Sequence, residues 1–144
     1  MHNCNLFRTL RKFEIDTGVK KEKLRIEYLF HRVSKASLWN CLSTSGGLAE
    51  WFADAVTDNN KVFSFTWNKN KADAEMIGIN PLSYIRFHWL DDDDDSYFEF
   101  RLHKTELTGD WILEITDFAE EDETNNAITL WDTQIKTLKR RLGV

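Results

Sequence analysis

The sequence predicts one α+β domain in which a curved antiparallel sheet of about six to seven strands packs against a long C-terminal helix. Three observations lead to this fold class. Apolar and polar side chains alternate in successive short runs joined by polar turns. Two short helical segments follow the first run, and the last segment carries an apolar stripe of helical period. A strongly curved sheet needs a cover for its concave face, and the last helix has the length and the stripe to supply it.

The first 20 residues differ from the rest of the chain. Leu6, Phe7, Leu10 and Phe13 fall at helical spacing, but this apolar face is short and lacks the continuous run of a signal peptide. We therefore expect residues 1–20 to be a weakly ordered N-terminal extension and residues 21–144 to be the domain. A docking or membrane-surface helix and a start codon read too far upstream are the alternatives.

The first strand and two short helices are expected before residue 53. From residue 23 to 31 apolar and polar side chains alternate, which is typical of a strand with one buried face. Ser34 or Ser37 offers a side-chain oxygen to cap the helix that follows. We expect Gly46-Gly47 to end that helix, and residues 48–52 to form a second short one.

Alternation returns after the turn signal Asp58-Asn-Asn60 and predicts an antiparallel meander. One of the runs stops at Pro81, the single proline. The side chains expected on the buried face are Phe63, Phe65, Trp67, Ala72, Ala74, Met76, Ile85, Phe87, Trp89, Phe98, Phe100, Leu102, Trp111, Leu113 and Ile115.

The last segment predicts an amphipathic helix of about five turns. Its apolar stripe consists of Ala127, Ile128, Trp131, Ile135, Leu138 and Leu142. Acidic residues 120–123 precede the helix and basic residues 139–141 end it, so each charge favours the helix dipole at its end. Gly143 is a suitable stop signal.

Composition excludes several classes of protein. The 144 residues are 42% hydrophobic and 13% aromatic, which is enough apolar volume for one core and too much for a disordered chain. The 24 acidic against 19 basic residues disfavour a nucleic-acid binder. No apolar run approaches the roughly 18 residues of a membrane helix. Cys4 and Cys41 are too few for a disulfide framework, and we expect a cytoplasmic protein.

The titratable residues show no pattern of a metal or catalytic site. The four histidines, His2, His31, His88 and His103, lack metal-ligand spacing, so no metal and no cofactor are expected. Residues 91–95 are five consecutive aspartates without the interleaved ligands of a calcium loop, and we interpret them as a solvated hairpin tip. Cys41 falls inside a predicted helix, where a buried and inert thiol is expected.

An ordered set of segments resembles the START-like, or helix-grip, superfamily, also called SRPBCC. The resemblance is closest to the branch of the activators of heat-shock protein 90 ATPase and covers roughly residues 22–142. The segments that carry it are Ser34-Lys-Ala-Ser-Leu-Trp39, Gly47-Leu-Ala-Glu-Trp-Phe52, Val62-Phe-Ser-Phe-Thr-Trp67, Ala72 to Ile79 ending at Pro81, Tyr84 to Trp89, and Leu130-Trp-Asp. It implies the helix-grip fold.

The resemblance also implies a cavity between the sheet and the long helix. The residues that would line it are Trp51, Phe52, Phe63, Phe65, Trp67, Ile85, Phe87, Trp89, Phe98, Phe100, Trp131 and Ile135. Several large aromatic side chains on one curved face rarely pack without gaps, and an apolar gap can hold an apolar ligand. The alternative is that the same side chains fill a core.

Three functions follow from the resemblance. The leading hypothesis is non-catalytic binding of a small hydrophobic molecule, either a lipid or an aromatic metabolite. The second is a co-chaperone-like domain that binds a protein partner or a second copy of itself. The third is a cyclase- or hydrolase-like enzyme, which would need polar side chains inside the cavity. Arg86, Glu99 and Arg101 would supply them only if the strand register were shifted by one residue.

Overall fold

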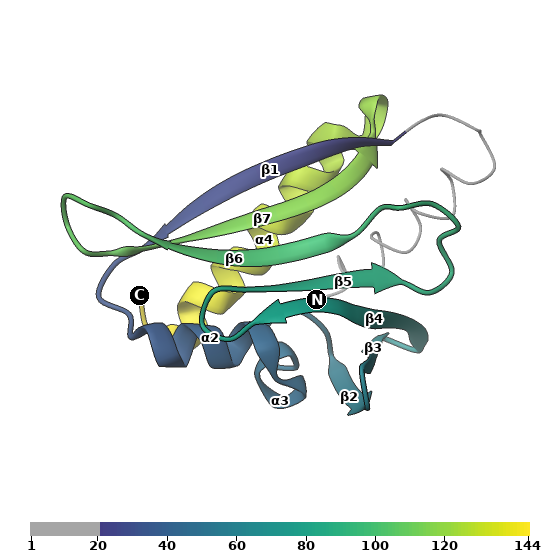
Figure 1. The fold of residues 1–144 in the computed structure, drawn as a ribbon, viewed down its shortest axis with the longest axis horizontal. Coiled ribbons are helices and arrows are strands. Elements are labelled where there is room, and N and C mark those ends of the chain that lie inside the picture. The colour runs from purple at the N-terminus through teal and green to yellow at the C-terminus, as the bar shows by residue number, and fades with distance from the viewer. Residues whose placement is uncertain (1–20) are drawn as a thin grey trace.

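A seven-stranded antiparallel sheet forms one layer of the structure, and α4 (Thr124–Leu142) crosses behind it (Figure 1). The computed structural model describes residues 21–144. The strands are β1 (Lys21–Phe30), β2 (Ala55–Asn59), β3 (Val62–Trp67), β4 (Asn70–Asn80), β5 (Tyr84–Trp89), β6 (Phe98–Lys104) and β7 (Trp111–Glu120). The helix-grip fold class predicted from the sequence is confirmed. The predicted extension, residues 1–20, lies outside the described residues.

The sheet order is β1-β7-β6-β5-β4-β3-β2, so β2 to β7 form a meander and β1 pairs with β7. Inward-facing side chains of neighbouring strands combine large and small residues. Phe63 lies opposite Ala74 and Phe65 lies opposite Ala72, which leaves room for the rings above β4. The register between β4 and β5 shifts between Met76 and Gly78, a bulge that bends β4.

Two short helices, α2 (Lys35–Ser43) and α3 (Ser45–Leu48), follow β1. The hydroxyl of Ser34 accepts a hydrogen bond from the backbone N–H of Ser37 and caps α2, which resolves the choice between the two serines. The prediction for the second helix was wrong. Thr44 Oγ1 accepts from the N–H of Gly47 at 2.9 Å, so α3 begins before the glycine pair instead of after it.

The sequence pattern predicts no strand over the residues of β2. This edge strand pairs with β3, and four of its five residues are exposed. Val56 is its one partly buried side chain packed on the core. A mostly polar edge strand leaves no alternation to detect, because its side chains have little to pack against.

Helix α4 matches its prediction closely. Its buried residues include Ala127, Trp131, Ile135 and Leu138 from the predicted stripe, and it ends at Gly143, whose φ of 77° is in the left-handed region. A 3-10 turn, η2 (Glu121–Glu123), joins it to β7. Within residues 21–144, no helix is both long and apolar enough to cross a membrane.

Candidate functional site

The candidate site is the aromatic interior between the concave face of the sheet and helices α2 to α4. All twelve residues predicted to line a cavity lie there, and each is at most 6% exposed. Phe52 lies at the centre. Its ring is stacked with that of Trp131 at 5.8 Å between centroids and meets the ring of Phe65 edge-on at 5.1 Å. The interior is therefore one continuous set of rings that reaches from β3 to α4.

Polar groups of this interior converge on the backbone of Phe52. Its carbonyl oxygen accepts a hydrogen bond from Trp67 Nε1 at 2.7 Å and another from Gln134 Nε2 at 2.8 Å. Gln134 is on α4 and only 2% exposed. The turn after α3 is thus attached to β3 and α4 by hydrogen bonds inside the core.

A buried carboxyl group faces the same interior. Asp117 is on β7, 2% exposed, and its Oδ2 accepts a hydrogen bond from Trp131 Nε1 at 3.0 Å. Its Oδ1 accepts from the backbone N–H of Phe118 at 2.8 Å. Asp117 lies opposite Leu24 in the β1–β7 ladder. An acidic side chain at this depth is unusual, because burying a charge among apolar groups is costly.

Asp117 and Gln134 are not among the residues predicted from the sequence. The signal for Asp117 was present, since residues 111, 113, 115, 117 and 119 alternate onto one face of β7. Gln134 lies three residues after Trp131, on the same face of α4. Both were passed over because the apolar residues alone were used to define the buried faces.

Two hollows flank the last turns of α4. The first, which we call the Trp51 hollow, measures about 610 Å³ and is lined by Ala49, Glu50, Trp51, Ala53, Asp54, Thr137, Arg140 and Arg141. The second, the Lys139 hollow, measures about 660 Å³ and is lined by Leu29, His31, Arg32, Asp110, Lys139, Leu142, Gly143 and Val144. Both lie at the rim of the aromatic interior, and Trp51 belongs to the interior as well. Both are of the size that small ligands occupy.

The residues considered for an enzymatic site lie on the other face of the sheet. Glu99 is 4% exposed, and Arg86 Nη2 and Arg101 Nε bind its two oxygens at 2.7 and 3.0 Å. Burial opposes ionisation of Glu99, but the hydrogen bonds from Arg101 and Arg86 outweigh it and lower its pKa. Because the shifted register is not adopted, these groups do not enter the aromatic interior.

The aspartate run forms the β5–β6 connection, as predicted, but it is not uniformly solvated. Asp92 is 5% exposed, and Lys21 Nζ lies 3.4 Å from its Oδ2 and 2.8 Å from Oδ2 of Asp94. Although burial opposes ionisation, hydrogen bonds from Lys21 and Ser96 lower the pKa of Asp94 to about 2.

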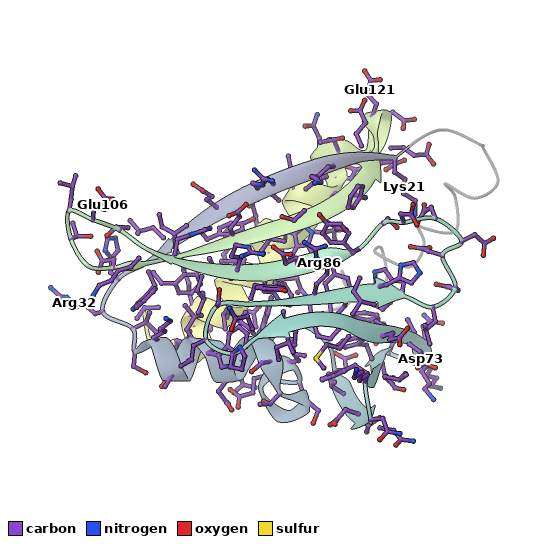
Figure 2. All side chains as sticks on the ribbon, in the orientation of Figure 1. Lys21, Arg32, Asp73, Arg86, Glu106 and Glu121 are labelled. Atoms are coloured by element: carbon purple, nitrogen blue, oxygen red, sulfur yellow. The ribbon has the colours of Figure 1, made fainter. Side chains whose placement is uncertain are left out.

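Lys21 and the acidic Glu121 lie at one end of the molecule, and Arg32 and Glu106 lie at the other (Figure 2).

The histidines and the cysteine within residues 21–144 lie in surroundings that fit structural roles. His31 Nδ1 lies 2.9 Å from Asp110, and His103 Nε2 lies 2.6 Å from Glu114. No three His, Cys, Asp or Glu side chains within residues 21–144 are grouped to hold a metal ion. Burial and the nearby Glu50 raise the pKa of the Cys41 thiol, which disfavours a reactive thiolate.

Comparison with known proteins links the whole described domain to one family. A family model, described as a START-like superfamily domain, matches residues 18–144. A solved structure of a Bacteroides fragilis protein is 46% identical, with a TM-score of 0.63, and the match covers 85% of this chain and 91% of that chain.

More distant structures share the fold. The Aha1 dimer of Colwellia psychrerythraea is 16% identical, with a TM-score of 0.67, over 85% of this chain and 96% of that chain. A Mesorhizobium loti protein is 17% identical, with a TM-score of 0.66, over 83% of this chain and 95% of that chain. None of the curated proteins matches the sequence.

Proposed function

Because this chain belongs to the START-like superfamily, we propose that it binds a small apolar molecule between the concave face of its sheet and α4. The superfamily fold is a ligand-binding fold. In this chain the ligand is a lipid or an aromatic metabolite, and it is held without being chemically changed. The aromatic interior supplies the apolar contacts that such a ligand needs.

One observation carries the proposal: two buried polar side chains, Asp117 and Gln134, face an otherwise aromatic interior. A few converging polar groups among many apolar ones are typical of ligand sites, where they orient the bound molecule. Asp117 and Gln134 approach the interior from opposite sides, one from β7 and one from α4.

The Trp51 hollow lies beside this interior. The ring of Trp51 lies between the Trp51 hollow and Phe100, whose ring centroid is 5.6 Å away. A rotation of Trp51 together with a small displacement of the last turns of α4 would join the hollow to the interior. Collective motions of helices take microseconds to milliseconds.

The first experiment is native mass spectrometry of the freshly purified protein, followed by extraction under denaturing conditions. A reproducible excess mass that extracts as an apolar compound supports the proposal. Protein that carries no such compound is then titrated with N-phenyl-1-naphthylamine, an uncharged apolar dye whose fluorescence rises on burial. The expected result is saturable binding at one site per chain, and the absence of any saturable signal would overturn the proposal.

The location of the dye is tested by the indole N–H signals of the tryptophans in ¹⁵N-labelled protein. Trp67 and Trp131 donate their indole N–H groups inside the aromatic interior, whereas Trp111 is only partly buried at the beginning of β7. We expect the dye to shift the first two signals and to leave that of Trp111 unchanged. Trp67→Phe, Trp131→Phe and Trp111→Phe each remove one signal and so assign the three. Shifts confined to Trp111 would place the dye on the surface and contradict the proposal.

A further inference from the structure

Strand β1 forms one margin of the sheet and pairs on one side only, with β7 (Figure 1). It is ten residues long, twice the length of β2 at the other margin. Within the described part of the chain, the backbone of residues 22–30 makes no hydrogen bond besides its ladder with β7. A long edge strand of this kind is a template on which another strand can pair.

The hydrogen bonds of the neighbouring ladder determine which backbone groups of β1 point outwards. The N–H of Thr105 donates to the carbonyl oxygen of Asp110 at 2.8 Å, between the ends of β6 and β7. Hydrogen-bonded and non-hydrogen-bonded pairs alternate along an antiparallel ladder. Ile115 therefore turns its backbone polar groups away from β6 and towards Ile26, which lies opposite it in β1. The N–H and C=O groups of residues 25 and 27, on either side of Ile26, consequently point away from β7.

Two copies of β1 can pair antiparallel through these outward-pointing groups, about a two-fold axis at Ile26. Arg25 of each copy then lies opposite Glu27 of the other, so two pairs of opposite charge form on one face of the sheet. On the other face Ile26 lies opposite itself, and Leu24 lies opposite Tyr28. Because these three side chains are only partly buried in the single chain, a second copy would bury further apolar surface.

The neighbouring registers place like charges opposite each other. An axis at Arg25 would pair Lys23 with Glu27, but it would set the two copies of Arg25 against each other. An axis at Glu27 would oppose two glutamates, and an axis at Leu24 would oppose Lys23 and Arg25. Like charges directly opposite are unfavourable in a sheet. Charged side chains on an edge strand usually prevent pairing, and here they disfavour these registers and favour the one centred on Ile26.

Both charged side chains are available for a second copy. Arg25 Nε lies 2.7 Å from Oε2 of Glu114 in the same chain, yet the Arg25 side chain is 59% exposed. Its guanidinium keeps further N–H donors for another carboxylate. Glu27 is exposed, forms no ion pair within residues 21–144, and lies opposite Glu114 in the β1–β7 ladder. An arginine from a second copy would offset the repulsion between these two carboxylates.

We propose that two copies of this chain dimerise through β1, antiparallel about a two-fold axis at Ile26, and so form one continuous sheet. Backbone hydrogen bonds supply the pairing, and the two Arg25–Glu27 pairs select the register. The interface is the margin of the sheet, so this inference goes beyond the proposed function and does not depend on a ligand in the aromatic interior.

The first test is the mass of the full chain in solution, measured by light scattering and sedimentation velocity over a series of concentrations. The expected result is a concentration-dependent rise towards twice the chain mass of 17.0 kDa. A mass that stays at that of one chain up to about 1 mM protein would overturn the inference.

Charge reversal tests the register. Arg25→Glu and Glu27→Arg should each weaken dimerisation by about tenfold or more, because like charges replace both opposite pairs. The double variant should dimerise again, since it restores two opposite pairs. An equimolar mixture of the two single variants should do the same, because one copy then carries two acids and the other two arginines. Dimers that Glu27→Arg leaves intact, or that neither the double variant nor the mixture restores, would contradict the proposed register.

Asp58→Arg is the matched control, because it makes the same change of charge on an exposed residue of β2, the other margin of the sheet. It should leave the dimer unchanged. A dimer lost in Asp58→Arg and kept in Glu27→Arg would place the interface at β2 and overturn the inference. Circular dichroism checks that each variant is folded. Binding of N-phenyl-1-naphthylamine, measured in parallel, reports on the proposed function alone, so the failure of either proposal is recognised separately.

Discussion

Arg86 Nη2 lies 2.7 Å from Oε1 of Glu99, and the two side chains face each other across β5 and β6 on the face of the sheet away from α4. Arg101 binds the second oxygen of the same carboxylate at 3.0 Å. The guanidinium of Arg86 also lies 4.0 Å from the ring centroid of Tyr97, and that of Arg101 lies 4.3 Å from the ring centroid of Tyr84. This arrangement joins neighbouring strands through a buried acid held between two arginines.

Glu99→Gln should destabilise the fold and leave ligand binding unchanged. The substitution leaves two arginines without their shared anion, at an expected cost of about 1–3 kcal/mol in the free energy of unfolding. Urea denaturation measures the loss, with Glu106→Gln in the exposed β6–β7 turn as the control. Because Glu99 is on the face of the sheet away from α4, the affinity for N-phenyl-1-naphthylamine should not change. A shift in dye affinity without a loss of stability would contradict the structural role of Glu99.

Phe52 should contribute more to stability than Phe63, although both are buried phenylalanines. The ring of Phe52 is stacked with Phe98 at 5.7 Å and with Trp131, whereas Phe63 lies near the margin of the sheet against Phe65 and Phe87. Phe52→Leu should lower the free energy of unfolding by about 1–3 kcal/mol, and Phe63→Leu by about 1 kcal/mol or less. Equal losses in urea denaturation would show that the central position of Phe52 carries no extra stability.

The alternation of apolar and polar side chains predicted most of the sheet, because inward-facing residues meet the protein core and outward-facing residues meet water. Phe87 and Arg86 are neighbours in the chain, yet the first is fully buried and the second reaches solvent. The same reasoning found α4 from its stripe. It could not find β2, since an exposed edge strand has no buried face that would impose alternation on its residues.

The candidate site was only partly predictable. The twelve aromatic and aliphatic residues were identified because burial selects apolar side chains at regular spacing. Whether they enclose an empty space depends on side-chain rotations that spacing does not determine. Asp117 and Gln134 were not predicted because the buried faces were defined by apolar side chains, and only three-dimensional packing distinguishes a buried polar residue from an exposed one.

The Lys21–Asp94 ion pair should make stability depend on pH in the acid range. The pKa of Asp94 in the folded protein is about 2, below its ordinary value of 3.8, so the ionised form stabilises the fold above that ordinary value. This contribution is lost as the pH falls from about 4 towards 2. Thermal unfolding of the wild type and Asp94→Asn should differ at pH 6 and converge towards pH 2. Asp95→Asn, the same change one residue further along the loop, is the control, and a difference independent of pH would refute the prediction.

Gly46 and Gly47 are neighbours in α3, but only Gly46 has room for a side chain. A Cβ atom on Gly47 would lie 2.0 Å from the backbone oxygen of Asn40, whereas one on Gly46 would meet nothing within 4 Å. The close approach exists because the N–H of Gly47 donates to Thr44 Oγ1, which turns α3 back against the end of α2. Gly47→Ala must therefore move the backbone of one helix.

The expected cost of Gly47→Ala is about 1–3 kcal/mol or more in the free energy of unfolding, as for other overpacked positions. Gly46→Ala should be neutral or stabilising by up to about 1 kcal/mol, because alanine is the better helix former and the site is open. Denaturation midpoints of the two variants give the comparison directly. Since α3 leads into Trp51 and Phe52, Gly47→Ala should also weaken binding of N-phenyl-1-naphthylamine, and Gly46→Ala should not. Equal stability of the two variants would mean that α2 and α3 are not held as closely as the structure places them.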